Sequence, residues 1–211
     1  MATAKTYRLS ELAEIVIGYQ HRERVLDAEH GSHQMIQARD VVFETVPEIG
    51  FSGWRVKTEN LDRVTPKGDA TRYRLSPGDV LFVSRGVANI AIPMVNPYVE
   101  PFPDDWDTII PAYLYYILHP KTDIVTAEYL AWFINQPPTQ AAVSKQLRGS
   151  LLKLLPKAEF EALAISVPPL EMQERIVQLE RLRAQEESLL KRLIATRQHL
   201  IQQTCLRAIS A

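Results

Sequence analysis

The final fifth of the chain contains a stretch without glycine or proline that runs from Leu170 to about Leu206 and is rich in Leu, Gln, Glu and Arg. These residue types have high helix propensity, so one continuous helix is the simplest structure for the stretch. At 1.5 Å per residue, about 36 residues would extend over roughly 54 Å, well beyond the usual length of a helix in a globular domain. The sequence therefore predicts a helix that something outside the domain must cover.

This predicted helix carries an apolar stripe with an approximate spacing of three and four residues, which is typical of helices that pair with other helices. Glu186 and Thr196 interrupt the stripe at two positions. We expect the apolar side chains to form an interface with a partner chain. They are Ile176, Leu179, Leu182, Leu189, Leu190, Leu193, Ile194, Leu200 and Ile201.

The chain divides at Pro168-Pro169 into a predicted globular domain, residues 1–168, and the helical segment, residues 169–211. Because two prolines precede the helix, we expect a rigid junction between the parts. At the other end of the domain, residues 9–18 have apolar side chains at helical spacing. They predict a short amphipathic helix with Ser10 as its cap and Gly18 as its stop signal.

The rest of the domain mixes strand and helix signals. Pro77-Gly78 predicts a turn, followed by a buried strand over residues 80–83. Further strands are expected near residues 35–36, 41–43, 112–118 and 164–167, and helices over 126–136, 139–147 and 156–163. The sequence thus predicts an α+β fold: a twisted mixed or antiparallel sheet with short flanking helices, followed by one long C-terminal helix.

The charge balance argues against a uniformly basic surface, because 24 Lys and Arg residues oppose 25 Asp and Glu residues for a net charge of −1. Any DNA-binding surface must therefore be a local patch. One candidate is Lys145, Arg148, Lys153 and Lys157, with no acidic residue between positions 146 and 158. The run predicts either a phosphate-facing strip or an ordinary solvated surface.

Other candidate DNA contacts lie beside predicted loops or strand ends. Arginine side chains can bind phosphates or guanine edges, and glutamine can pair with adenine. The arginines are Arg22, Arg24, Arg39 and Arg85, and the glutamines are Gln20 and Gln37.

The sequence offers no recognisable catalytic or metal site. Asn96-Pro97-Tyr98 lacks the second proline of an amino-methyltransferase motif, and Asp104-Asp105 lacks the downstream lysine of many nucleases. His30 and His33 have no nearby cysteine to complete a zinc site. We therefore expect no catalytic residue, no metal and no cofactor.

The single cysteine, Cys205, excludes an intramolecular disulfide and suits a reducing, cytoplasmic location. No segment has the length and apolar character of a signal peptide or a membrane span. We expect no membrane partner.

The order of these motifs resembles the specificity subunits of type I restriction-modification systems. The resemblance covers nearly the whole chain: residues 9–18, 36–41, 77–81 and 129–133, the pair Gly149-Ser150, and the junction over residues 165–177. The junction Pro168-Pro169-Leu170-Glu171-Met172-Gln173 is its most specific part, although Met172 stands where the family usually has glutamate. The prolines preset the helix start, and Glu171 lies in its first turn, where negative charge is favoured.

The resemblance implies a non-catalytic subunit that reads double-stranded DNA, with Ser150 among the DNA-binding residues. Usual family members have two recognition domains and two long helices, so this chain resembles half a subunit. It implies that residues 1–168 are a target recognition domain and that two copies pair through their long helices. It also implies that a DNA methyltransferase, with or without a restriction or translocase subunit, docks around the pair at a bipartite site.

Two other functions remain open from the sequence. The chain can be a protein-interaction module or an inactive remnant that reads no DNA, which its near-neutral charge would suit. It can also be an enzyme in which tyrosines and Asp79 perform acid-base chemistry, although Asp79 is better explained by the predicted turn.

Overall fold

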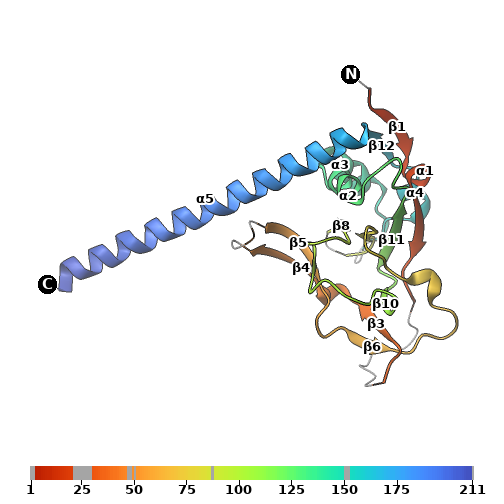
Figure 1. Ribbon diagram of the computed structural model, residues 1–211, viewed down its shortest axis with the longest axis horizontal. Coiled ribbons are helices and arrows are strands. Elements are labelled where there is room, and N and C mark those ends of the chain that lie inside the picture. The colour runs from red at the N-terminus through yellow and green to blue at the C-terminus, as the bar shows by residue number, and fades with distance from the viewer. Residues whose placement is uncertain are drawn as a thin grey trace.

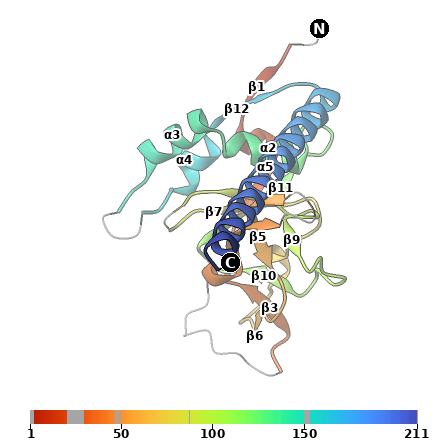
Figure 2. The same cartoon turned by 90° about the vertical axis from the view of Figure 1, so that its left-hand side faces the viewer.

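The computed structural model describes residues 3–20, 30–46, 49, 51–86, 88–149 and 153–210, with the side chain of Ser210 left out. Strands and short helices form a globular body. One helix, α5 (Leu170–Ser210, 41 residues), leaves this body and extends far beyond it (Figure 1, Figure 2). The predicted α+β fold with a long C-terminal helix is confirmed.

A four-stranded antiparallel sheet lies inside the body. Its strands, in spatial order, are β2 (Ala13–Ile17), β11 (Tyr115–Pro120), β7 (Val80–Val83) and β8 (Ala91–Pro93). Because successive side chains point to opposite faces, Phe82 and Tyr116 enter one hydrophobic core while Leu81 and Ile117 enter another. The sheet therefore separates two cores and is covered on both faces.

The first core is covered mainly by helices: α1 (Leu9–Leu12), α2 (Ala127–Ile134), α3 (Pro137–Gln146) and α4 (Lys157–Glu161). Beside them, β1 (Lys5–Arg8) pairs antiparallel with β12 (Ala164–Val167). Thr126 caps α2 as predicted, since its hydroxyl accepts a hydrogen bond from the Tyr129 N–H at 3.2 Å. The predicted helix near residue 160 and the strand over 164–167 are also confirmed.

The second core is covered by two three-stranded mixed sheets. One consists of β10 (Ile109–Pro111), β3 (His33–Ile36) and β6 (Asp62–Val64), and the other of β4 (Val41–Val46), β5 (Phe51–Lys57) and β9 (Val99–Glu100). Short 3₁₀ helices, η1 (Ala38–Asp40) and η3 (Thr71–Tyr73), connect strands. The strands expected near residues 35 and 41 are confirmed.

The helix predicted over residues 9–18 is wrong beyond its first turn. After Leu12 the chain becomes β2, where buried Ala13 and Ile15 flank exposed Glu14 in a two-residue period. Pairing with β11 satisfies the backbone of this segment in place of helical hydrogen bonds. The predicted cap, Ser10, is also wrong, because α1 starts after Arg8. The Arg8 N–H donates to the Glu11 carboxylate at 2.6 Å.

Gly18 has a role different from the predicted helix stop. A Cβ atom at this position would lie 2.2 Å from the Ala112 carbonyl oxygen. The glycine therefore permits two backbones to approach closely. The strand expected over residues 112–118 starts later, at Tyr115, because the Tyr115 N–H donates to the Ala112 carbonyl at 3.0 Å in a turn.

The turn predicted at Pro77-Gly78 is confirmed, and Gly78 has a positive φ of 91°. Asp79 closes the turn: its N–H donates to the Ser76 carbonyl at 3.0 Å and its carboxylate accepts from the Ser76 N–H at 2.7 Å. Asp79 is thus occupied in turn structure, as the sequence suggested.

The start of α5 is attached to the body through a buried glutamine. The Gln173 side-chain amide donates to the carbonyls of Ile124 and Pro168 at 2.9 and 2.8 Å, and its oxygen accepts from the Thr126 N–H at 2.9 Å. Gln173 is fully buried, so these hydrogen bonds form away from water and have strict geometry. They connect the first turn of α5 to the start of α2.

Candidate nucleic-acid interface

An open groove of about 690 Å³ lies where β2 and β7 meet the loops beside the central sheet. Three cationic side chains line it, together with one glutamine, one glutamate and three tyrosines, and the rest of the wall is mostly backbone and aliphatic. These polar and aromatic residues are Arg72, Arg85, Lys157, Gln20, Glu14, Tyr73, Tyr113 and Tyr116. The groove thus combines positive charge with aromatic side chains.

Arg85 is the cation most constrained by its surroundings. Its guanidinium carbon lies 5.1 Å from the centre of the Tyr113 ring, close enough for a cation–π interaction. Its Nε atom is buried and has no hydrogen-bond partner among the residues that the structure describes. Arg85 also forms no ion pair in the described part of the chain, so the charge of its guanidinium is available to an anionic or carbonyl ligand.

The wall beside Arg85 is held by backbone contacts from the segment before α4. Leu154 forms isolated bridges with both Arg85 and Arg148. The next residue, Leu155, donates its N–H to the Ser84 carbonyl at 3.0 Å and accepts from the Tyr116 hydroxyl at 2.6 Å. These contacts fix the segment against β7 and β11, and they place the predicted basic strip next to the groove.

The four residues of the basic strip differ in their surroundings. Lys145 and Lys153 are exposed. Arg148 pairs with Glu159 at 3.0 Å, and Lys157 pairs with Glu161 at 3.0 Å. Both glutamates follow the stretch without acidic residues, positions 146–158, so the sequence pattern did not indicate these two ion pairs. Exposed ion pairs of this kind are weak, so phosphates can compete for both cations.

Arg39 and Gln37 do not line the groove. Both contact Asp62: the Gln37 amide donates to its carboxylate at 2.6 Å, and the Arg39 guanidinium forms an ion pair with it. The same carboxylate holds the pKa of Arg39 above its ordinary value, chiefly through this hydrogen bond. Arg22, Arg24 and Ser150 lie outside the described residues.

The groove also contains residues that the sequence reading did not select, Arg72 and Tyr113. Arg72 stacks over the ring of its neighbour Tyr73, 4.6 Å from the ring centre. Tyr113 is 43% exposed, which is high for a large aromatic side chain. The sequence predicted a strand over residues 112–118, in which Tyr113 would be an ordinary strand residue. In the structure Tyr113 lies in the turn before β11, and its side chain is exposed.

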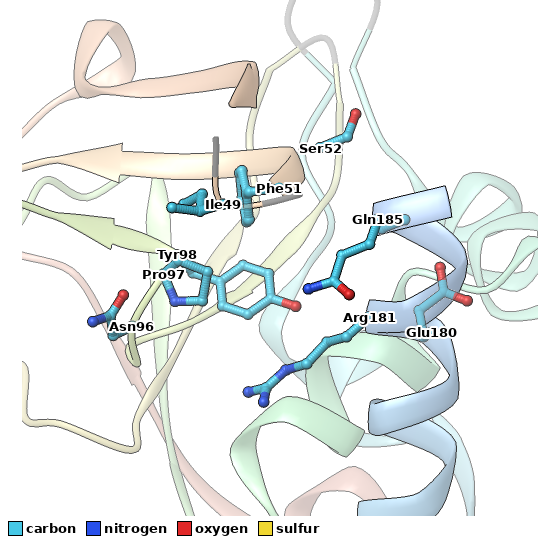
Figure 3. Close-up of a pocket in the computed structure, with 10 residues that line it drawn as sticks. Ile49, Phe51, Ser52, Asn96, Pro97, Tyr98, Glu180, Arg181 and Gln185 are labelled. Atoms are coloured by element: carbon cyan, nitrogen blue, oxygen red, sulfur yellow. The ribbon is translucent and has the colours of Figure 1, made fainter. Parts of the chain in front are cut away.

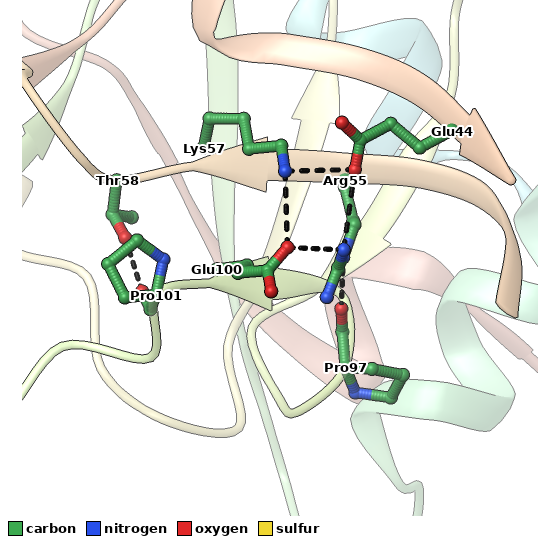
Figure 4. Close-up of polar contacts among 7 residues, drawn as sticks. All are labelled: Glu44, Arg55, Lys57, Thr58, Pro97, Glu100 and Pro101. Atoms are coloured by element: carbon green, nitrogen blue, oxygen red, sulfur yellow. Dashed lines mark hydrogen bonds and ion pairs between the residues drawn. The ribbon is translucent and has the colours of Figure 1, made fainter. Parts of the chain in front are cut away.

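A second group of charges lies on β4, β5 and β9 and has a different character (Figure 4). Arg55, only 3% exposed, pairs with Glu44 at 3.3 Å and also with Glu100, and its Nε donates to the Pro97 carbonyl at 2.6 Å. Lys57 bridges the same two carboxylates at 2.9 and 3.1 Å. Two cations and two anions thus neutralise one another.

A smaller hollow of about 270 Å³ separates the body from α5 (Figure 3). Phe51 and Tyr98 line it from the body, and Arg181 and Gln185 line it from the helix. Arg181 also forms an ion pair with Glu128 of α2. Burial raises the pKa of the Tyr98 hydroxyl, which therefore stays protonated. These contacts brace α5 against the body beyond its first turns.

The apolar stripe of α5 is exposed over most of its length. Leu179 and the predicted interface residues from Leu182 to Ile201 are each more than half exposed. Ile176 is the exception, because it packs against the first core. Within the described part of the chain, no helix is long and apolar enough to cross a membrane, and no three metal-ligating side chains lie together.

Neither models of protein families nor curated proteins match this sequence. Solved structures do match. The S subunit of a type I restriction-modification system from M. genitalium is 9% identical with a TM-score of 0.52, and the alignment covers 96% of this chain and 44% of that one. The HsdS subunit from Thermoanaerobacter tengcongensis is 17% identical with a TM-score of 0.57, covering 89% and 39%.

A third match comes from work on complex assembly and conformational transition of the type I restriction-modification system. It is 19% identical with a TM-score of 0.58, and the alignment covers 96% of this chain and 43% of that one. In all three cases the chain spans less than half the length of the matched structure. The body and the long helix together thus have the fold of one half of a type I restriction-modification S subunit.

Proposed function

We propose that this chain reads a DNA sequence on behalf of a separate DNA methyltransferase. In this proposal residues 1–168 form the target recognition domain, and residues 169–211 form a helix for pairing and partner docking. Two copies together read a bipartite site, and a restriction or translocase subunit can join the complex.

The observation that carries the proposal is the groove around Arg85, within the fold of an S subunit. Arg85, Arg72 and Lys157 supply positive charge in a concave wall, and the basic strip lies beside them. Phosphate contacts of this type provide most of the affinity of a DNA-binding protein. Gln20 is exposed on the same wall, and in this proposal its amide pairs with an adenine edge, which offers a matching donor and acceptor.

Local charge is what makes this proposal compatible with a net charge of −1. The quartet around Arg55 is internally neutral, and many helix residues pair within α5, as Arg183 does with Glu180 and Glu187. In the groove, Lys157 pairs only with Glu161 at a partly exposed position, and Arg72 and Arg85 form no ion pair in the described part of the chain. DNA contacts are therefore expected at the groove and the basic strip rather than over the whole surface.

The alternative function, a protein-interaction module that reads no DNA, is favoured by the exposed apolar stripe alone. A DNA reader and an interaction module would both use that stripe to bind a partner, so the two functions differ only in whether the chain binds a DNA sequence. The test is selection from a random double-stranded library by the full chain, with and without its methyltransferase subunit. A DNA reader enriches a defined sequence in the presence of the methyltransferase, whereas an interaction module gives a flat profile.

A matched variant controls for unspecific electrostatics in this experiment. Lys121 is an exposed lysine just beyond the far end of β11 from Tyr113. Lys121→Ala removes the same charge as a groove variant and is expected to enrich the same sequence as the unaltered chain. If it abolished enrichment as fully as Arg85→Ala, the groove would not be the reading surface.

A further inference from the structure

Two large apolar side chains are exposed in the groove around Arg85, among its cations. Ile17 is 46% exposed and Tyr113 is 43% exposed, and both line this groove. A single exposed apolar side chain is ordinary on a protein surface. Two of them in one cationic groove are not explained by phosphate binding, because phosphate oxygens bind to charged and hydrogen-bonding groups. The groove therefore offers apolar contact area in addition to positive charge.

Two arginine–tyrosine pairs line the same groove. The guanidinium of Arg85 lies over the Tyr113 ring, 5.1 Å from its centre, and that of Arg72 lies over the Tyr73 ring, 4.6 Å from its centre. A planar guanidinium is a stacking surface for a nucleic-acid base, as an aromatic ring is. Each pair thus combines a positive charge that suits a phosphate with flat groups that suit a base.

Backbone contacts bring the two pairs to the same end of β2. The strand is followed by Gly18, which packs against the carbonyl of Ala112, the residue before Tyr113. One residue further along, the ring of Tyr19 lies edge-to-face with the ring of Tyr73, with 5.3 Å between the ring centres. Consecutive residues after β2 therefore contact the surroundings of both pairs.

The concave shape of the groove decides which part of a DNA molecule these groups can reach. In an intact duplex the base edges lie at the floor of the major groove, which is about 8.5 Å deep, so protruding protein elements read them. A concave protein wall meets the sugar-phosphate backbone, which presents no base plane for stacking. The stacking groups of this groove therefore have no counterpart in fully paired DNA, whereas a base that has left the stack supplies one.

We infer that the groove holds one nucleotide whose base has swung out of the double helix. Its base packs against Ile17 and Tyr113, and the amide of Gln20 hydrogen-bonds with the base edge. Arg72 and Arg85 bind the adjoining phosphates. The groove volume of about 690 Å³ is large enough for one nucleotide, because proteins bind small organic molecules in pockets of about 300 to 1,000 Å³. The inference rests on DNA binding by this groove, which is part of the proposed function, and it names the form of DNA that is bound.

The cost of removing a base from the stack sets the expected preference among DNA substrates. This cost is smallest for a base that has no pairing partner. Stacking on an aromatic side chain is favourable for every kind of base. We therefore expect the chain to bind a duplex with one unpaired base about tenfold more tightly than the fully paired duplex.

Competition titrations of the full chain with two DNA pools measure this preference. Both pools contain the same mixed-sequence duplexes, but in one pool an abasic residue replaces the nucleotide opposite the central base. The two pools then carry equal numbers of phosphates, so a difference in affinity cannot come from the number of charges. About tenfold tighter binding to the abasic pool is expected, and equal binding to both pools would overturn the inference.

Substitution of Tyr113 separates stacking from the greater flexibility of abasic DNA. Tyr113→Ala removes the ring and should reduce the preference to less than about twofold, whereas Tyr113→Phe keeps the ring and should retain the preference. Phe43→Ala is the matched control, because Phe43 is 60% exposed on β4, outside the groove, and this variant should also retain the preference. A Tyr113→Ala chain that still preferred the abasic pool as strongly as the unaltered chain would contradict the inference.

Two further variants test apolar contact and charge separately. Ile17→Ser removes apolar area but no charge, so it should reduce the preference about threefold without changing the salt dependence. Lys157→Ala should weaken binding to both pools equally and flatten the slope of log affinity against log salt by about one. If Lys157→Ala reduced the preference as far as Tyr113→Ala does, charge would explain the preference and the inference would fail.

The inference and the proposed function fail in different ways. Enrichment of a sequence from the fully paired library, together with equal affinity for the two pools, would retain sequence reading and exclude the swung-out nucleotide. A flat library profile, together with a preference that depends on Tyr113, would exclude sequence reading and retain the swung-out nucleotide.

Discussion

Two groups of positive side chains in this protein illustrate opposite uses of charge. Arg55 and Lys57 are enclosed by Glu44 and Glu100, and the four side chains satisfy one another (Figure 4). Arg85 lies in an open groove with a buried Nε that has no partner among the described residues. The comparison indicates that counting arginines says little: a cation with its partners at hand stabilises the fold, and one without them is available to a ligand.

The largest effect is expected from removing the enclosed arginine. Arg55→Met leaves Glu44 and Glu100 with only Lys57 between them, and should lower the free energy of unfolding by about 3 kcal/mol. Urea denaturation measures this loss. Lys57→Met, at a more exposed position of the same quartet, is the matched control and should cost less than half as much. A loss below about 0.5 kcal/mol for Arg55→Met would contradict the assignment of this cluster to stability.

The next effect concerns the strip beside the groove. Changing Lys145, Arg148 and Lys153 together to Ala should weaken DNA binding about thirtyfold, because up to three phosphate contacts are removed. The slope of log affinity against log salt should also flatten by about 2 to 3. Titrations at several salt concentrations give both numbers. An unchanged slope would mean that these residues are only a solvated surface.

A single groove substitution should act more weakly on binding and hardly at all on stability. Arg85→Ala is expected to reduce DNA affinity about tenfold while changing the free energy of unfolding by less than about 0.5 kcal/mol. Arg85→Lys sharpens the result: it should retain affinity if Arg85 contacts a phosphate, and lose base preference if the guanidinium reads guanine. A large loss of stability in Arg85→Ala would mean that Arg85, like Arg55, stabilises the fold and is not available to a ligand.

The smallest effect belongs to a pair between these extremes, His119 and Asp79, whose side chains lie 2.8 Å apart. The hydrogen bond to Asp79 raises the pKa of His119 above its ordinary value of 6.5. The pair therefore stabilises the fold fully below about pH 6.5 and loses this contribution as pH rises through the higher folded pKa. Unfolding measured from pH 6 to 9 should show a fall of less than about 1 kcal/mol, absent in His119→Gln.

Sequence reasoning predicted the elements that depend on local signals. The proline-glycine turn, the Thr126 cap and the long helix after Pro169 each follow from the chemistry of a few neighbouring residues. Residues 13–17 were misassigned because their apolar spacing fits a helix as well as a strand, and pairing with β11 decided between them. Pairing partners lie a hundred residues away and cannot be seen in a local pattern.

The candidate site was only partly predictable for a related reason. Arg85 and Gln20 were selected because they stand near strand ends, and the fold brings both to one groove. Arg39 and Gln37 were selected on the same grounds, yet the structure places Asp62 between them. Whether a side chain is neutralised depends on a carboxylate some 25 residues away, and the sequence gives no sign of that pairing.

The buried amide of Gln173 attaches the start of a long helix to the body, so small changes there are amplified at the far end. Together with the packing of Val177 and the Arg181–Glu128 ion pair, its hydrogen bonds fix the direction in which 41 helical residues leave the body, a span of about 60 Å. Over such an arm, a tilt of about 5° at the root displaces the tip by about 5 Å, more than one base-pair step of DNA. The accuracy with which the far end is aimed is thus decided by contacts near the start of the helix, those of Gln173 and the Arg181–Glu128 ion pair among them.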